Sequence, residues 1–121
     1  MVNRSKAQGT AWERELRLAL SEALQVPVRR LAEEGIHDEG DLEFELAGQR
    51  FVVECRDRET MQAHTAIQAA RTKAGQALSF VAWKRKRKVP GRANRVQVGR
   101  PIAIMDLQDL ITVIGLLGKE Q

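Results

Sequence analysis

The stretch Asp41-Leu42-Glu43-Phe44-Glu45-Leu46, followed after a short connection by Phe51-Val52-Val53-Glu54-Cys55-Arg56, decides the fold. Its first half alternates acidic and apolar side chains, which is typical of a β-strand with one apolar and one polar face. Its second half has the composition of another strand. Gly48 in the connection allows a tight reversal, so the stretch predicts a β-hairpin.

Two positions of the turn keep the apolar side chains of the hairpin on one face. A two-residue turn at Gly48-Gln49 leaves Asp41 and Glu54 as diagonal neighbours on the other face. A turn at Ala47-Gly48 places the same two carboxylates directly opposite each other. A slip by one residue would set Leu42 opposite Glu54 and mix the faces. The patterning therefore predicts that Asp41 and Glu54 share a face.

Clustered carboxylates repel each other and need a compensating positive charge. Their oxygens suit a hard divalent cation such as Mg²⁺, so Asp41 and Glu54 are candidate metal ligands. In the alternative, Asp41, Glu43 and Glu45 form the solvated face of an antiparallel sheet, and Glu54 pairs with an arginine. The spacing alone leaves both interpretations open. The candidates for that arginine are Arg30, Arg50 and Arg56.

Helices and further strands are expected around the hairpin. The first helix places Trp12 on its apolar face and Glu13 among the polar residues of its other faces. Asp106 is expected to cap the last helix. The expected elements are a helix at 8–24, a strand at 26–31, a helix at 60–76, a strand at 78–83, a strand at 96–98 or 102–105, and a last helix with Leu107, Leu110, Ile111 and Ile114 on its apolar face. This order, α-β-β-β-α-β with a β/α tail, predicts an α/β fold.

Length and charge narrow the class of protein. At 121 residues, 43% of them hydrophobic, the chain is expected to form one domain over residues 1–121. Lys and Arg total 20 against 16 Asp and Glu, a net charge of +4. The basic residues gather at Lys84–Lys88 and just after it, apart from the acidic residues between Glu33 and Glu59. This separation favours a polyanionic partner, although a solvated basic loop is the alternative.

Membrane and disulfide-bonded classes are not indicated. No apolar stretch reaches the length of a bilayer span, and the first residues contain no apolar signal core, so we expect a cytoplasmic protein with no membrane partner. Cys55 is the single cysteine, which leaves no partner for an internal disulfide and excludes a cysteine-based zinc site. Its apolar surroundings predict a buried thiol in the core.

The motifs together resemble those of the PD-(D/E)XK nucleases. Gly40-Asp41, a strand and turn, and then Val52-Val53-Glu54-Cys55-Arg56 is similar to the signature D-x(n)-[D/E]-x-K. The helix opening at 9–16 and the basic strand Val28-Arg29-Arg30 resemble the corresponding parts of Holliday-junction resolvases. Val81-Ala82-Trp83-Lys84-Arg85 is comparable to a stretch in small resolvase-like nucleases encoded by bacteriophages, to which the resemblance is strongest.

The resemblance implies a restriction-endonuclease-like fold, with a central mixed sheet flanked by helices. It implies an endonuclease for branched DNA in recombination, dependent on Mg²⁺ or Mn²⁺. We expect it to act as a homodimer, because a four-way junction offers two symmetric cleavage points. The host cytoplasm would be the location of a phage-encoded protein. Asp41, Glu54 and the backbone carbonyl of Cys55 would bind the metal, and Glu13 would assist. The implied DNA contacts are Arg29, Arg30, Lys84, Arg85, Lys86, Arg87, Lys88, Arg92 and Arg95.

One departure from the family's signature bears on catalysis. Arg56 stands where the family has lysine, and a guanidinium keeps its proton in a protein, so Arg56 cannot act as a general base. It can still hold a phosphate or stabilise transition-state charge. If the reaction needs proton abstraction at this position, the chain is instead a non-catalytic nucleic-acid-binding module on the same fold. Lys73 on the second helix could substitute, but the sequence does not give its direction.

Three candidate assignments have alternatives in which the residues have no functional role. Glu13 could simply pair with Arg17, one helical turn away. His37 in the loop before the hairpin is expected to be an ordinary loop residue rather than a ligand. Three residues of the second helix share one face and could either line the site or face solvent: His64, Gln68 and Arg71.

Overall fold

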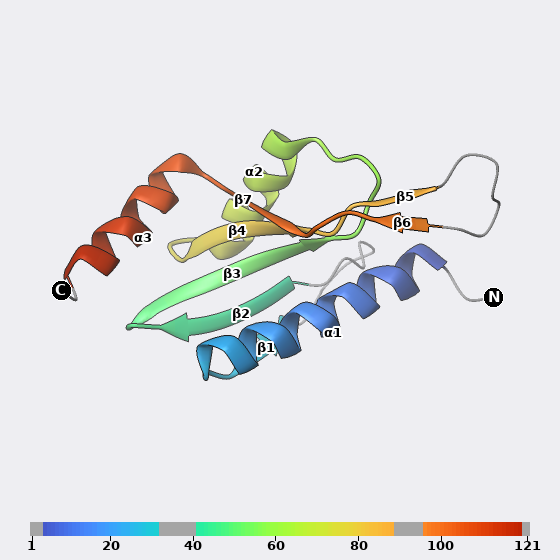
Figure 1. Ribbon diagram of the computed structural model, residues 1–121. Coiled ribbons are helices and arrows are strands. Elements are labelled where there is room, and N and C mark those ends of the chain that lie inside the picture. The colour runs from blue at the N-terminus through green and yellow to red at the C-terminus, as the bar shows by residue number, and fades with distance from the viewer. Residues whose placement is uncertain (1–3, 32–40, 89–95, 120–121) are drawn as a thin grey trace.

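The computed structural model describes residues 4–31, 41–88 and 96–119, and the side chains of residues 11–31, 41–85 and 98–119. Strands β1 to β3 lie between the first two helices along the chain, and β4 to β7 lie between the second and the third (Figure 1). In chain order they are α1 (Arg4–Leu24), β1 (Val28–Arg30), β2 (Asp41–Leu46), β3 (Gln49–Arg56), α2 (Ala63–Ala74), β4 (Leu78–Trp83), β5 (Lys86–Lys88), β6 (Val96–Val98), β7 (Ile102–Met105) and α3 (Leu107–Lys119).

A five-stranded sheet in the order β1-β2-β3-β4-β7 forms the centre of the fold. Strands β1, β2 and β3 run antiparallel to one another, β3 and β4 are parallel, and β7 returns antiparallel to β4. The parallel pair is joined through α2, as a parallel connection requires. The protein is therefore α/β, with a mixed sheet flanked by helices in the restriction-endonuclease-like order that the sequence predicts.

Helix α1 covers one face of the sheet (Figure 1). Trp12 is its main anchor, because the ring packs among Leu42, Val53 and Cys55 while its Nε1 donates a hydrogen bond to the carbonyl of Ala82 at 3.1 Å. The bond satisfies the indole N–H that burial removes from water. Leu16, Leu20 and Leu24 extend the same contact along the helix.

Helix α2 covers the opposite face and packs closely because its buried residues are small. Ala66 and Ala70 lie against Val81 of β4, whereas the next residue, Ala82, belongs to the cluster under α1. Side chains alternate along a strand, so Glu54 points toward α2 while its neighbours Val53 and Cys55 point toward α1. The sheet is thus covered on both sides. Asp41 is buried rather than solvated, whereas Glu45 is exposed and Glu54 pairs with Arg56, as the alternative interpretation has it.

Several predicted boundaries are confirmed and others are wrong. The hairpin and β4 form as expected, and both alternatives for the next strand occur, as β6 and β7. Helix α1 begins at Arg4 rather than residue 8, and α2 spans less than the predicted 60–76 because Gly75, with φ at 63°, ends it. The basic run was not expected to form a strand, yet Lys86–Lys88 pairs with Val96–Val98 as β5 and β6.

Helix α3 is held at its first turn and projects from the sheet (Figure 1). Asp106 caps it as predicted, since its Oδ1 accepts from the amide of Gln108 at 3.0 Å. Asp109 is buried and accepts from Arg71 and from the amide of Ser79. The apolar face that the sequence predicts for α3 is exposed in the structure. No helix in the described segments is long and apolar enough to span a membrane.

Candidate active site

The pairing of β2 with β3 brings Asp41 directly opposite Glu54. The left-handed Ala47 and Gly48 form the two-residue turn, so the second of the two predicted registers is the one adopted. Asp41 is 3% exposed and Glu54 is 0% exposed. Asp41 Oδ1 and Glu54 Oε2 are both buried and have no hydrogen-bond donor among the described residues. Burying two carboxylates in this way is costly unless cations compensate.

Two cationic side chains compensate part of this charge. Lys73 reaches down from α2, with its Nζ 2.8 Å from Asp41 Oδ2 and 3.2 Å from Glu54 Oε1. The Arg56 Nη2 lies 2.5 Å from the same Glu54 Oε1. Both cations therefore bind one edge of the carboxylate pair and leave Asp41 Oδ1 and Glu54 Oε2 for a further positive group.

The charges within the cluster shift the pKa values of its members. Burial raises the pKa of Glu54 to about 7, and the hydrogen bond and negative charge of Asp41 add to the effect against Arg56 and Lys73. Partial burial lowers the pKa of Lys73, but its hydrogen bond to Asp41 and the charges of both carboxylates outweigh burial and raise it. Lys73 is thus a firmly protonated partner of the pair.

The sequence suggests Lys73 as a substitute for the family's lysine but does not show that its side chain enters the site. The missing signal was the helical phase of α2. Ala66, Ala70 and Ala74 mark the buried stripe, and Lys73 lies three residues after Ala70 and seven after Ala66, on the same face. With the α2 axis over the acidic face, this phase directs the lysine toward Asp41 and Glu54.

Glu13 approaches from α1 and is buried, so its assignment to the polar faces of that helix was wrong. Its Oε2 lies 3.1 Å from the Arg30 Nε of β1, which explains how a carboxylate remains under the helix. Burial raises the pKa of Glu13, Arg30 and Arg17 lower it, and Asp41 is near enough to raise it again. Within the described residues, no three acidic, histidine or cysteine side chains gather as a metal-binding group.

Cys55 follows Glu54 on β3, and its side chain lies on the opposite face of the sheet, under α1. Its thiol is buried in the cluster under α1, as predicted, and burial raises its pKa, with the charges of Asp41 and Glu13 adding to the shift. The thiol is consequently inert as a nucleophile. Any contribution of Cys55 to a metal comes from its backbone carbonyl.

Four of the side chains predicted to contact DNA are described, and each has an acidic or carbonyl partner: Arg29, Arg30, Lys84 and Arg85. Arg29 is 3.5 Å from Glu43, which also binds Arg50 at 2.7 Å. Lys84 lies 2.5 Å from Glu15 Oε2 and its ammonium is 5.3 Å from the centre of the Trp12 ring. The contacts of Lys84 tie the end of β4 to α1, and those of Glu43 join β2 to the strands on either side of it.

Other predicted residues lie elsewhere or outside the described parts. Only the backbone is described for Lys86, Arg87 and Lys88, and His37, Arg92 and Arg95 lie outside the described residues. The polar face of α2 does not reach the carboxylates. Its Arg71 binds Asp109 at 2.9 Å, and His64, Gln68 and Arg71 border a shallow cavity of about 470 Å³ next to α3.

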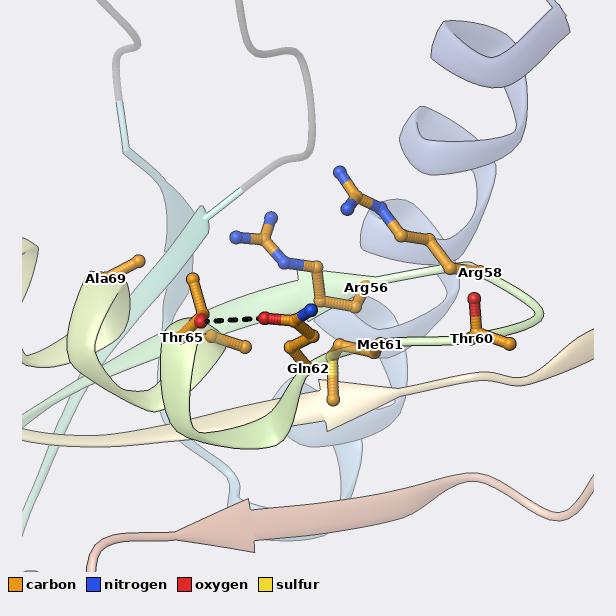
Figure 2. Close-up of a pocket in the computed structure, with 8 residues that line it drawn as sticks. Arg56, Arg58, Thr60, Met61, Gln62, Thr65 and Ala69 are labelled. Carbon is orange, nitrogen blue, oxygen red and sulfur yellow. Dashed lines mark hydrogen bonds between the residues drawn. The ribbon is translucent and has the colours of Figure 1, made fainter.

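A larger cavity, of about 540 Å³, opens beside Arg56 where residues 57–62 join β3 to α2 (Figure 2). Figure 2 shows the guanidinium groups of Arg56 and Arg58 extending on the same side of this connection. The remaining lining residues are uncharged: Thr60, Met61, Gln62, Thr65, Ala66 and Ala69.

Comparison with known proteins finds a structural likeness. No protein-family model and no curated protein sequence matches the chain. Among solved structures, the chain is similar to Hjc of Archaeoglobus fulgidus, a Holliday junction resolvase from an archaeal hyperthermophile. The TM-score is 0.47 at 18% identity, over 84% of this chain and 92% of that one.

Proposed function

We propose that the protein is a metal-dependent endonuclease that hydrolyses phosphodiester bonds in branched DNA, as Holliday-junction resolvases do. One observation carries the proposal. Asp41 and Glu54 are paired across a hairpin and buried, and each has one oxygen with no donor in the part of the chain that the structure describes. Two cations, Arg56 and Lys73, lie beside them. Carboxylates that could hold a metal, beside cations that could hold a phosphate, are what phosphoryl hydrolysis requires.

The donor set fits a hard divalent cation. Asp41 Oδ1 and Glu54 Oε2 are anionic oxygens already removed from water, and a cation bound to both would relieve their unmet charge. Asp41, Glu54 and the Cys55 carbonyl would hold Mg²⁺ or Mn²⁺, with Glu13 assisting from α1. When bound, such a metal lowers the pKa of a coordinated water and neutralises charge on the phosphoryl oxygens.

The protein's own cations would orient the substrate. Arg56 presents a planar fork of donors that matches two phosphate oxygens, and its contact with Glu54 fixes where the fork lies. Lys73 adds a second positive charge from the helix side. Since a guanidinium keeps its proton, Arg56 holds and stabilises the phosphate but accepts no proton.

A homodimer would suit a branched substrate, because a four-way junction presents two symmetric cleavage points. Helix α3 supports this part of the proposal. Large apolar side chains on one of its faces are 41% to 69% exposed, and patches of this kind mark protein interfaces. They are Leu107, Leu110, Ile111, Ile114 and Leu117. We propose that a second copy covers them.

A second candidate function is a nucleic-acid-binding module without catalysis. Lys73 and Arg56 favour it, because they already supply two positive charges to the two carboxylates. On this view the cluster is a neutral structural network, and DNA binds through basic side chains alone.

Incubation of the purified protein with labelled four-way junction, duplex and single-stranded DNA separates the two functions. The nuclease cleaves the junction in magnesium and not in chelator. A binding module retains the junction in both conditions and cleaves none of the three substrates with magnesium or manganese.

A further inference from the structure

The cavity beside Arg56 belongs to neither the carboxylate pair nor the basic run, and nothing so far gives it a role. Arg56 connects the cavity to the carboxylate pair, because its side chain lines the cavity and also contacts Glu54. A ligand in the cavity would therefore lie next to a substrate held at Asp41 and Glu54.

The chemistry of the lining selects an anion. Two guanidinium groups, from Arg56 and Arg58, provide up to ten N–H donors between them, some used by protein partners. Thr60 and Thr65 add hydroxyl groups, of which the Thr65 hydroxyl also donates to Gln62 Oε1 at 3.4 Å, and no acidic side chain of the described residues lines the cavity. The first turn of α2 forms part of the wall and also has no acidic residue, so nothing there opposes a negative ligand.

The end of β4 and the two residues after it hold the backbone of the connection that carries Arg58. The Trp83 Nε1 donates to the carbonyl of Arg58 at 2.7 Å, and the Arg85 Nε donates to that of Glu59 at 3.1 Å. The amide of Lys84 donates to the Arg56 carbonyl at 2.8 Å. These bonds position the backbone under Arg58, so its side chain starts from a defined place.

We propose that this cavity is a second phosphate subsite, which binds the DNA backbone phosphate adjacent to the one held at Asp41 and Glu54. Arg58 and Thr65 are its specific residues, while Arg56 lies between the two phosphates. The volume of about 540 Å³ accommodates a phosphate with its sugar rather than an isolated ion. This subsite rests on the proposed DNA substrate but not on cleavage.

Binding of a fluorescent four-way junction in chelator tests the subsite without hydrolysis. Arg58→Gln should weaken binding about fivefold to tenfold at low salt and reduce the slope of log K against log salt by roughly 0.9, the value for one phosphate contact. Thr65→Val should weaken binding by a smaller factor. The matched control, Arg14→Gln, removes an exposed charge from α1 on the other face of the sheet and should leave affinity and slope close to wild type.

Single methylphosphonate linkages identify the phosphate. One neutral linkage near the junction centre should weaken wild-type binding by the same factor as Arg58→Gln, and should weaken binding of Arg58→Gln no further, since both changes remove one contact. Circular dichroism confirms folding of each variant. Wild-type protein that binds with this coupling but never cleaves would keep the subsite and overturn the nuclease. Equal affinity and salt slope for Arg58→Gln and wild type, or additive losses at every linkage, would overturn the subsite.

Discussion

The Lys73 ammonium of α2 lies 2.8 Å from Asp41 Oδ2, across the space between the helix and the first residue of β2. The same nitrogen is 3.2 Å from Glu54 Oε1, so one helical cation joins the two carboxylates of the hairpin. A metal held by these carboxylates would share them with Lys73, and each cation would weaken the hold of the other.

Removing the charge of Lys73 should therefore affect metal binding and catalysis in opposite directions. Lys73→Gln should raise the affinity for Mn²⁺ about tenfold, or 1.4 kcal/mol, a modest figure because the lysine side chain is 40% exposed and partly screened. Cleavage should fall on the order of a hundredfold if the ammonium also stabilises phosphate charge. Calorimetric titration with metal measures the first effect, and Lys119→Gln on α3 is the control. Unchanged Mn²⁺ affinity would mean that the metal and Lys73 do not share these carboxylates.

Arg56 decides between the nuclease and the binding module. If its role is electrostatic, Arg56→Lys should retain cleavage within roughly tenfold, and Arg56→Ala should lose on the order of a hundredfold or more. Single-turnover rates on the junction measure both. Wild type that is inert with every metal while Arg56→Lys gains activity would identify a binding module. Equal rates for wild type and Arg56→Ala would remove Arg56 from the site.

The raised pKa of Glu54 predicts how pH changes the stability of the metal-free protein. The folded state binds the proton more tightly than the unfolded state, whose pKa is near 4.5, because the folded value is about 7. This contribution is complete below about pH 4.5 and is lost as pH rises through about 7. The melting temperature in chelator should therefore fall by several degrees between pH 6 and 8.

Glu54→Gln isolates this contribution, because glutamine keeps the shape of the side chain and does not titrate. The fall in melting temperature between pH 6 and 8 should be largely absent in this variant. Glu45→Gln, an exposed change on the neighbouring strand, should keep the wild-type slope. A variant Glu54→Gln that melts with the full wild-type pH dependence would assign the titration to another group.

The apolar face of α3 predicts the oligomeric state. Ile114, which is 59% exposed, lies in the middle of that face, so Ile114→Glu should convert a dimer to a monomer. Thr112→Glu adds the same charge at an exposed position on the same helix but off the apolar face. Light scattering after size exclusion should show a dimer for wild type and Thr112→Glu. A monomeric wild type, or a dimeric Ile114→Glu, would exclude this interface.

The hairpin could be predicted because both local rules agreed. Alternation predicted which side chains share a face, and the turn had two positions that preserved it, both of which make Asp41 and Glu54 neighbours, as the structure confirms. The burial of the pair was not predictable, since it depends on α2 lying over the acidic face, a contact between segments distant in sequence.

The remaining errors share a cause in tertiary contacts. Glu13 looked like a surface residue because nothing local indicates that Arg30 of β1 meets it under α1. The basic run looked like a loop because β5 depends on its pairing with β6. The apolar stripe of α3 was predicted, but helical periodicity does not indicate whether such a stripe is covered, and in the structure it is exposed.

Substitution of Asp41 tests the central claim most directly, since its side chain is proposed to hold the metal and lies against both Lys73 and Glu54. Asp41→Asn should lose magnesium-dependent cleavage of the four-way junction by about a hundredfold or more, while circular dichroism and junction binding in chelator stay near wild type. Glu45→Gln, which removes an exposed carboxylate from the same strand, should cleave normally. Cleavage by Asp41→Asn at the wild-type rate and with the wild-type dependence on magnesium concentration would contradict a metal site at Asp41 and Glu54.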